Sequence, residues 1–366
     1  MQVDELLKLM VNKGASDLHL TVPSPPVLRI DGVLTPQEDL PPMTVKDVEL
    51  ALQRVATEEQ KSAFDREWEL DCAYTVPGLA RFRVNALRQR GGISLAFRFV
   101  PFYIPSIDEW GLPQIFKELI LRPRGLILVT GPSGSGKSTT LAAMLSHLND
   151  SATRSVITIE DPIEFIFRNK KCLVLQRDLG DDTKSFSTAV IHALRHDADV
   201  IVIGEMRDLD TISTAITAAE TGHLVLGTLH TIDAPQSIDR IIDIFPHGQQ
   251  QQIRVQLSQV IEAVISQTLL PRIDTGRIAA FEIMIANGVI RRLIRDEKIH
   301  EIHPNMEMSK LEGMQTLDQA LADLVKGNIV TMEEALLRSG NPVKLRQSLQ
   351  AQVEASTSQQ AAGTGN

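Results

Sequence analysis

Residues 131–138 read GPSGSGKS and match the spacing G-x-x-x-x-G-K-[ST] of a phosphate-binding P-loop. Glycines in such a loop let the backbone turn its N–H groups toward a polyphosphate. Lys137 adds a positive charge for the β- and γ-phosphates, and the Ser138 hydroxyl is a ligand for Mg²⁺. The motif therefore predicts binding of ATP or GTP together with Mg²⁺. The residues expected to contact the nucleotide are Ser133, Gly134, Ser135, Gly136, Lys137, Ser138 and Thr139.

A second candidate for the chemistry, Glu205, follows another apolar run. Residues 199–203 predict a buried strand, and Glu205 lies just beyond its C-terminal end, where ligands bind in parallel α/β sheets. A carboxylate in that place can orient the attacking water or hold Mg²⁺, directly or through a water molecule. We therefore expect Glu205 to be catalytic. The alternative is that it caps the helix that follows.

Three more carboxylates, Glu160, Asp161 and Glu164, follow a strand predicted over residues 155–159. Carboxylates so close in sequence repel one another unless a cation offsets their charge. This favours a role for Glu160 and Glu164 beside Mg²⁺ or beside an arginine of a neighbouring subunit. The alternative is a solvated turn, which Pro162 also favours.

Two histidines flank the strand predicted over residues 224–228. His230 lies at its C-terminal end, on the expected nucleotide side, where it can hydrogen-bond the γ-phosphate and sense hydrolysis. A histidine beside an apolar run is also often a packed, hydrogen-bonded residue, and the spacing does not separate the two interpretations.

Arginines alternate with apolar residues over residues 80–90. Arg81 and Arg83 therefore project from one face of a predicted strand, and Arg98 lies on the next strand. Such a row can stabilise phosphate charge supplied by a neighbouring subunit, as arginine fingers do. The alternative is an ordinary solvated face.

The composition is that of a globular protein: 366 residues, 43% hydrophobic and 23% charged. A formal net charge of −9 argues against broad nucleic-acid binding, which needs a basic surface. No stretch reaches the roughly 18 apolar residues of a membrane-spanning helix. Cys72 and Cys172 form no CxxC pair, which favours a reducing compartment and excludes a four-cysteine zinc module. The chain is expected to be cytoplasmic and not inserted in a membrane.

The pattern of elements predicts an α/β protein with two domains. Residues 1–99 read as a small α+β domain and residues 100–113, rich in proline, as a linker. Alternating strands and helices over residues 114–286 predict a mostly parallel sheet. Residues 287–349 read as helical and residues 350–366 as a disordered tail. The strands expected in the larger domain are 125–130, 155–159, 172–176, 199–203, 224–228 and 277–285.

Several blocks together resemble the retraction ATPases of type IV pili, within the secretion-ATPase superfamily. The resemblance covers about residues 1–348 and is carried by GASDLHL at 14–20, RFRVN at 81–85, the P-loop, TIEDPIE at 158–164, VIGEMRD at 202–208 and the segment 221–231. One block differs: the family's AIRNL motif stands here as VIRRL at 289–293, so that Arg292 replaces a neutral amide.

The resemblance implies a PAS-like N-terminal domain and a RecA-like ATPase domain in each subunit of a homohexameric ring. It implies an ATPase that drives pilus retraction and twitching motility, located at the inner-membrane base of the pilus. Its partners would be a platform protein and a PilU-like paralogue. It places Glu205 and His230 on the family's catalytic positions, and Arg81, Arg83 and Arg98 on its N-domain arginines.

Three alternatives remain open from the sequence. One is a pilus-assembly or secretion ATPase of the same superfamily, and the second is a weakly active accessory subunit of PilU type. The third is a simple nucleotide kinase, which would not need the arginine-rich domain.

Overall fold

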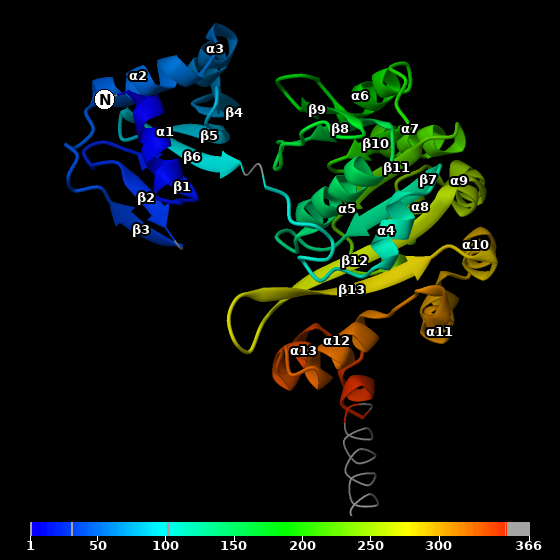
Figure 1. The fold of residues 1–366 in the computed structure, drawn as a ribbon. Helices are drawn as coiled ribbons and strands as arrows, with labels where there is room; N and C mark the ends of the chain where they lie inside the picture. Colours follow the sequence, from blue (N-terminus) through cyan, green and yellow to red (C-terminus); the bar gives the residue numbers. More distant parts are fainter. Residues whose placement is uncertain (1, 31, 101–102, 348, 350–366) are drawn as a thin grey trace, which may run out of the picture. The chain divides into compact units, whose positions relative to one another are not determined.

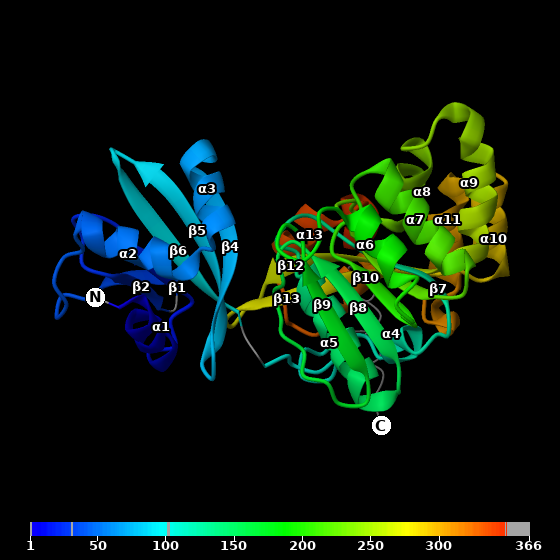
Figure 2. The same ribbon diagram turned by 90° about the horizontal axis from the view of Figure 1, so that it is seen from above.

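The structure, a computed structural model, describes residues 2–30, 32–100, 103–347 and 349. The chain divides into two compact units (Figures 1 and 2). The first comprises Met1–Ile104 and Pro162–Phe167, and the second comprises Pro105–Asp161 and Arg168–Asn366. The domain boundaries given above remain predictions, and the tail expected at 350–366 lies outside the described residues.

The first unit is an antiparallel sheet covered by helices, in the strand order β3-β2-β1-β6-β5-β4. Its elements are α1 (Val3–Asn12), β1 (Asp17–Leu20), β2 (Val27–Ile30), β3 (Val33–Pro36), α2 (Val45–Val55), α3 (Glu58–Glu67), β4 (Glu69–Val76), β5 (Ala80–Gln89) and β6 (Gly92–Val100). Capping boxes at Thr44 and Thr57 satisfy free N–H groups where α2 and α3 begin. The α+β organisation predicted for this part is confirmed. The sequence analysis missed α3, which buries only Phe64.

The second unit is built on a mainly parallel sheet in the order β13-β12-β7-β11-β10-β8-β9. Every pair is parallel except β12 with β13. The strands are β7 (Gly125–Thr130), β8 (Ser155–Glu160), β9 (Leu173–Asp178), β10 (Val200–Ile203), β11 (Leu224–Leu229), β12 (Ile261–Pro271) and β13 (Arg277–Ile285). All of the strands predicted for this part are present, within two residues at each end.

The strand β12 was not predicted, although it is the longest of this sheet. Helix α9 (His247–Val260) ends where β12 begins at Ile261, and no glycine, proline or turn residue separates them. Without such a break, the apolar residues of the strand read as a continuation of the helix.

Helices cover both faces of this sheet. Besides α9, the helices on the two faces are α4 (Ile115–Ile120), α5 (Lys137–Ser151), α6 (Phe186–Ala193), α7 (Leu209–Glu220) and α8 (Ala234–Asp243). Leu126 and Leu128 pack into one core together with α6, α7, α8 and α9. Ile127 and Val129 alternate with them and face the opposite side, where α5 packs on β7. Figure 2 shows the two layers of helices on either side of the strands.

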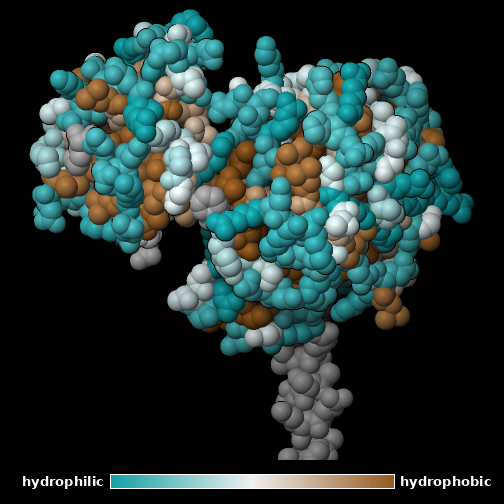
Figure 3. Space-filling view, turned by 45° about the horizontal axis from the view of Figure 1, so that its top comes forward, coloured by the Kyte–Doolittle hydropathy of each residue, from teal (hydrophilic) through white to brown (hydrophobic). Residues whose placement is uncertain are grey.

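The C-terminal part is helical, as predicted, with α12 beside the long pair β12–β13 (Figure 1). Its elements are α10 (Gly288–Arg295), η1 (Ile299–Glu301), α11 (Ile302–Met308), η2 (Lys310–Glu312), α12 (Leu317–Lys326) and α13 (Met332–Arg338). Among the described residues, none of the helices has the length and apolar character needed to cross a membrane. The face seen in Figure 3 is largely hydrophilic, with apolar side chains in scattered groups.

The core of the first unit gives a stability prediction. Phe82 is fully buried and lies edge-on to Phe99, with 6.2 Å between the ring centroids. We expect Phe82→Ala to lower the free energy of unfolding of this unit by about 3–5 kcal/mol, because it leaves a cavity. Leu34→Ala, at an exposed position of β3, should change it by less than about 0.5 kcal/mol. The measurement is urea unfolding followed by Trp68 fluorescence in a Trp110→Phe background, and equal effects of the two variants would contradict the prediction.

Candidate nucleotide-binding site

The P-loop joins the end of β7 to the start of α5. Gly131, Gly134 and Gly136 have φ angles of 142°, 76° and 92°, which residues with a Cβ atom rarely adopt. Helix α5 begins at Lys137, so its first N–H groups lack partners within the helix and carry its positive end. The Lys137 Nζ atom donates hydrogen bonds to the carbonyl oxygens of Gly131, at 2.7 Å, and Pro132, at 3.1 Å. The loop thus has the form and charge that a polyphosphate requires.

The sheet brings the predicted residues to the edge where the P-loop lies. Because β7, β11, β10 and β8 are parallel neighbours in that order, their C-terminal ends share one edge. His230 directly follows β11, and Glu160 is the last residue of β8. Glu205 follows β10 after one intervening residue. The strand β11 therefore separates Glu205 from the P-loop strand, and His230 comes from that intervening strand.

Glu205 is held by two side chains. Its Oε1 atom accepts hydrogen bonds from Arg207 Nε and from His230 Nε2, the latter at 2.7 Å. Burial favours the neutral carboxyl, but the hydrogen bond from Arg207 and the charges of His230 and Arg207 together outweigh it and hold the pKa of Glu205 below its ordinary value. An ionised carboxylate only accepts, so His230 Nε2 is the protonated nitrogen in this contact.

Arg207 is the cation that offsets the charges of Glu205 and Asp161. The hydrogen bond to Glu205 is the main reason why the pKa of Arg207 is raised, and the charge of Asp161 adds to it. Sequence reasoning expected Mg²⁺ or an arginine of a neighbouring subunit beside the carboxylates at 160–164, and that expectation stays a prediction.

The two other predicted glutamates differ in their surroundings. Glu160 accepts hydrogen bonds from Thr158 Oγ1 at 2.6 Å and from Gln176 Nε2 at 3.1 Å, at the edge of the sheet that carries the P-loop. Glu164 is exposed and lies in Pro162–Phe167, which groups with the first unit. The second unit therefore brings Glu160, but not Glu164, to the edge of the P-loop.

The three predicted arginines belong to the first unit. Arg83 on β5 and Arg98 on β6 are direct cross-strand partners, and Arg81 lies two residues from Arg83. Arg98 Nε lies 2.8 Å from Asp17 Oδ1, and Arg83 is 3.6 Å from Asp71. Two like charges opposite each other on a sheet repel, and these carboxylates offset the repulsion.

Sequence reasoning missed Gln267, a buried residue of β12 that supports the P-loop. Its Nε2 atom donates to the Ser135 carbonyl oxygen at 2.7 Å. The backbone carbonyl oxygen of Gln267 lies so close to Gly131 that a Cβ atom on residue 131 would be only 2.3 Å from it. The available signal was the three polar residues at 266–268 between apolar ones, but it required β12 to be recognised first.

Two buried atoms beside this contact have no hydrogen-bond partner within the part of the chain that the structure describes, Ser135 Oγ and Gln267 Oε1. Buried polar atoms in proteins are nearly always hydrogen-bonded, to protein, water or ligand. Their presence fits a loop that completes its contacts when a polar ligand binds.

The residues present also fit Mg²⁺. Among the described residues no group of three or more His, Cys, Asp or Glu side chains could hold a metal ion. Mg²⁺ in nucleotide sites needs no such cage, because it keeps several water molecules and is bound by one or two protein oxygens plus phosphates. Ser138, in the first turn of α5, supplies such an oxygen, and Glu205 can contribute through water.

Comparisons with known proteins find relatives over nearly the whole chain. The family model described as "Type II/IV secretion system protein" matches residues 2–338. The chain is similar to the type IV pilus retractation ATPase PilT of Pseudomonas aeruginosa, with 47% identity over 92% of this chain and 97% of that protein. It is 40% identical to the type IV pilus ATPase PilU of the same organism, over 94% of this chain and 91% of PilU.

A solved structure gives the same result for the fold. The crystal structure of the pilus retraction motor PilT with bound ADP has a TM-score of 0.89 and 45% identity, and covers 95% of this chain and 99% of that chain. The two-domain α/β fold expected from the resemblance is confirmed by this match.

The close approach of β12 to the P-loop gives a second prediction. We expect Gly131→Ala to lower the melting temperature and to abolish the stabilisation by ADP, because its Cβ atom would collide with the Gln267 carbonyl oxygen. Gly134→Ala is the matched control, since a Cβ atom there meets nothing within 4 Å and brings only about 1–2 kcal/mol of backbone strain. Thermal melting with and without ADP tests both, and a smaller loss of stability in Gly131→Ala would contradict the prediction.

Proposed function

The chain belongs to the family of type II/IV secretion system proteins, and within it we propose that this protein is the ATP-hydrolysing motor that retracts type IV pili. The chain is an ATPase of this family. One observation carries the proposal: a chain 47% identical to PilT over nearly its whole length brings a complete P-loop, Glu205 and His230 to one edge of its sheet.

The P-loop binds the phosphates of ATP. Its N–H groups and the first turn of α5 face the phosphate oxygens, and Lys137 exchanges its carbonyl partners for them. Mg²⁺ supplies positive charge for the oxygens of the transferred phosphoryl group. Ser138 would be its protein ligand. Gln267 keeps the loop in shape while the lysine moves, because it binds the Ser135 backbone.

Glu205 orients the attacking water. Arg207 and His230 both bind its Oε1 atom, and among the described residues nothing donates to its Oε2 atom. The Oε2 atom is thus the acceptor for water. Because the pKa of Glu205 is lowered, its carboxylate stays ionised and can accept a hydrogen bond from water. The hydrogen bond from His230 fixes the orientation of this carboxylate. Glu160, held by Thr158 and Gln176, adds negative charge at the same edge.

The arginines of the first unit complete the site of another subunit. In this proposal the protein is a homohexamer, and Arg81, Arg83 and Arg98 of one subunit stabilise the charge of the γ-phosphate bound by its neighbour. The cross-strand pair of Arg83 and Arg98 supports it, since both guanidinium groups are exposed on one face of the sheet. Glu164 contributes a carboxylate to the same site, from the segment Pro162–Phe167 that groups with the first unit.

The motor acts at the base of the pilus. We place it at the cytoplasmic side of the inner membrane, bound peripherally to a platform protein, with a PilU-like paralogue as a further partner. The second candidate is that this chain is itself an accessory ATPase of PilU type, which the 40% identity to PilU favours.

Removal of the Glu205 charge tests the hydrolytic role. We expect Glu205→Gln to retain ATP binding and to lose turnover by about 10²–10⁴-fold, because an amide is a poorer acceptor for the attacking water. Purified protein is assayed for ATPase activity and ATP affinity beside Asp210→Asn, a change in an exposed residue of α7. Turnover that survives in Glu205→Gln would remove the residue from the mechanism.

The same variant tests the output in cells. A host strain that carries Glu205→Gln in place of the native residue should display surplus surface pili and fail to move, because pili extend but do not retract. Bare cells would indicate an assembly ATPase. Normal retraction together with measurable turnover in the wild type would indicate the accessory role.

The arginine proposal is tested by mixing two inactive variants. Lys137→Ala keeps the arginines but loses the nucleotide site, and Arg83→Ala keeps the site but loses the arginine. If arginine and site belong to different subunits, mixed rings regain activity, because some interfaces contain both intact parts. A finger is worth about 10³–10⁵-fold in rate, so the recovery should be large. A mixture as inactive as its components would place both parts in one subunit.

A further inference from the structure

A row of polar side chains crosses the apolar sheet of the second unit. Thr130 on β7, Ser266 on β12 and Glu282 on β13 are register partners, so their side chains lie on the same face. Thr130 Oγ1 donates to Ser266 Oγ at 2.8 Å, and both groups are buried. The row begins next to Gly131 of the P-loop and ends at Glu282, whose exposed fraction is 2%.

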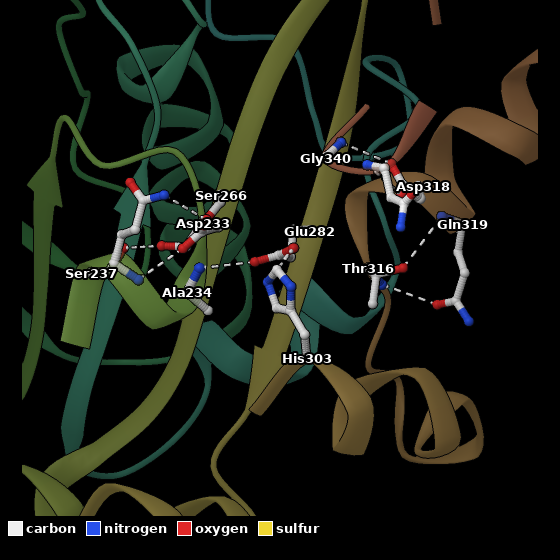
Figure 4. A network of polar contacts seen from close by, with 12 residues as sticks. Asp233, Ala234, Ser237, Ser266, Glu282, His303, Thr316, Asp318, Gln319 and Gly340 are labelled. Atoms are coloured by element: carbon white, nitrogen blue, oxygen red, sulfur yellow. Dashed lines mark hydrogen bonds and ion pairs between the residues drawn. The ribbon is translucent and has the colours of Figure 1, made fainter. Parts of the chain in front are cut away.

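Glu282 has two partners from different parts of the chain (Figure 4). Its Oε1 atom accepts a hydrogen bond from the backbone N–H of Ala234, at 2.8 Å, where α8 begins. Its Oε2 atom lies 3.3 Å from Nε2 of His303 on α11. A buried carboxylate requires such compensation, because it has lost its hydration.

The charge state of His303 depends on this contact. The close contact with Glu282 is the main cause that raises the pKa of His303, against the effect of burial, and the charges of Asp233 and Asp318 add to it. These three carboxylates come from β13, the N-terminus of α8 and the N-terminal part of α12. His303 is half-exposed, so it exchanges protons with solvent.

The segment 230–234 joins this network to the nucleotide site. His230 binds Glu205 at one end, and Ala234 binds Glu282 at the other. Between them, Thr231 Oγ1 lies 2.6 Å from Ser237 Oγ, which donates to the Asp233 carbonyl oxygen at 2.6 Å. A segment of five residues tied at both ends has little freedom, so the position of Ala234 limits where His230 lies.

We propose that Glu282 and His303 are positioning residues of the nucleotide site, which fix the start of α8 and thereby hold His230 against Glu205. The helix α11 thus takes part in ATP hydrolysis although it contributes no group to the reaction. This inference rests on the proposed function, since it assigns a role in the hydrolysis step.

The test combines variants at His303 with His230→Ala. We expect His303→Gln to lower kcat by about 10–100-fold, the scale for a misplaced catalytic group, with KM unchanged and at a temperature where the variant is still fully folded. His303→Lys, which keeps the positive charge, should restore most of kcat. In the His230→Ala background His303→Gln should cause no further loss, because its effect passes through His230.

Additive losses in the two backgrounds would overturn the inference, as would a loss in His303→Gln that arises entirely from a lower melting temperature. These outcomes differ from failure of the proposed function. If the wild type shows no more turnover than Lys137→Ala, the function fails. If the wild type hydrolyses ATP and the losses are additive, only the role of Glu282 and His303 fails.

The pH profile supplies a readout that a purely structural contact would not change. The imidazolium form is present below the raised pKa of His303 and is lost as pH rises through it. We therefore expect kcat of the wild type to fall with rising pH above the ordinary histidine value of about 6.5. In His303→Lys the fall should move to higher pH, because lysine keeps its charge there. Identical profiles for the two proteins would contradict the proposal.

Discussion

The contact on which the nucleotide site most depends is that between β12 and the P-loop. The backbone carbonyl oxygen of Gln267 leaves no room for a side chain at Gly131. The side-chain amide nitrogen of Gln267 donates to the backbone carbonyl oxygen of Ser135. A phosphate-binding loop works only if its N–H groups converge, and an unsupported glycine-rich segment would sample many other conformations. The sheet thus supplies the order that the glycines lack, and the parallel register then brings Glu205 and His230 to the same edge.

The electrostatics of the site follow a single pattern, in which each charge is paired before a ligand arrives. Lys137 donates to two carbonyl oxygens of the loop, and Glu205 accepts from Arg207 and His230. When ATP binds, its phosphates replace the carbonyl partners of Lys137, and the side chains around them already point in fixed directions. Such preorganisation lowers the reorganisation needed at the moment of reaction.

The sequence predicted most of the architecture and the residues with strong local signals. The P-loop has a fixed spacing, and apolar runs revealed β7, β10 and β11, so Lys137, Glu205 and His230 could be placed at one edge. It could not reveal β12, because α9 passes into it without a turn, and Gln267 was lost with it. Glu282 and His303 were also missed, since a lone acid in a strand and a histidine in a helix carry no pattern. Only the tertiary fold, which places α11 beside Glu282 of β13, brings them together.

The arginine pair of the first unit has a consequence for assembly. Arg83 and Arg98 are both exposed, with 43% and 69% of their side chains open to solvent, although each lies beside a carboxylate. Exposed charges attract an oppositely charged surface over a distance of about 8–10 Å at physiological ionic strength and over much less in concentrated salt. Dissolved ions therefore compete with any surface that these arginines recognise, and the rate of association through such a face falls as the salt concentration rises.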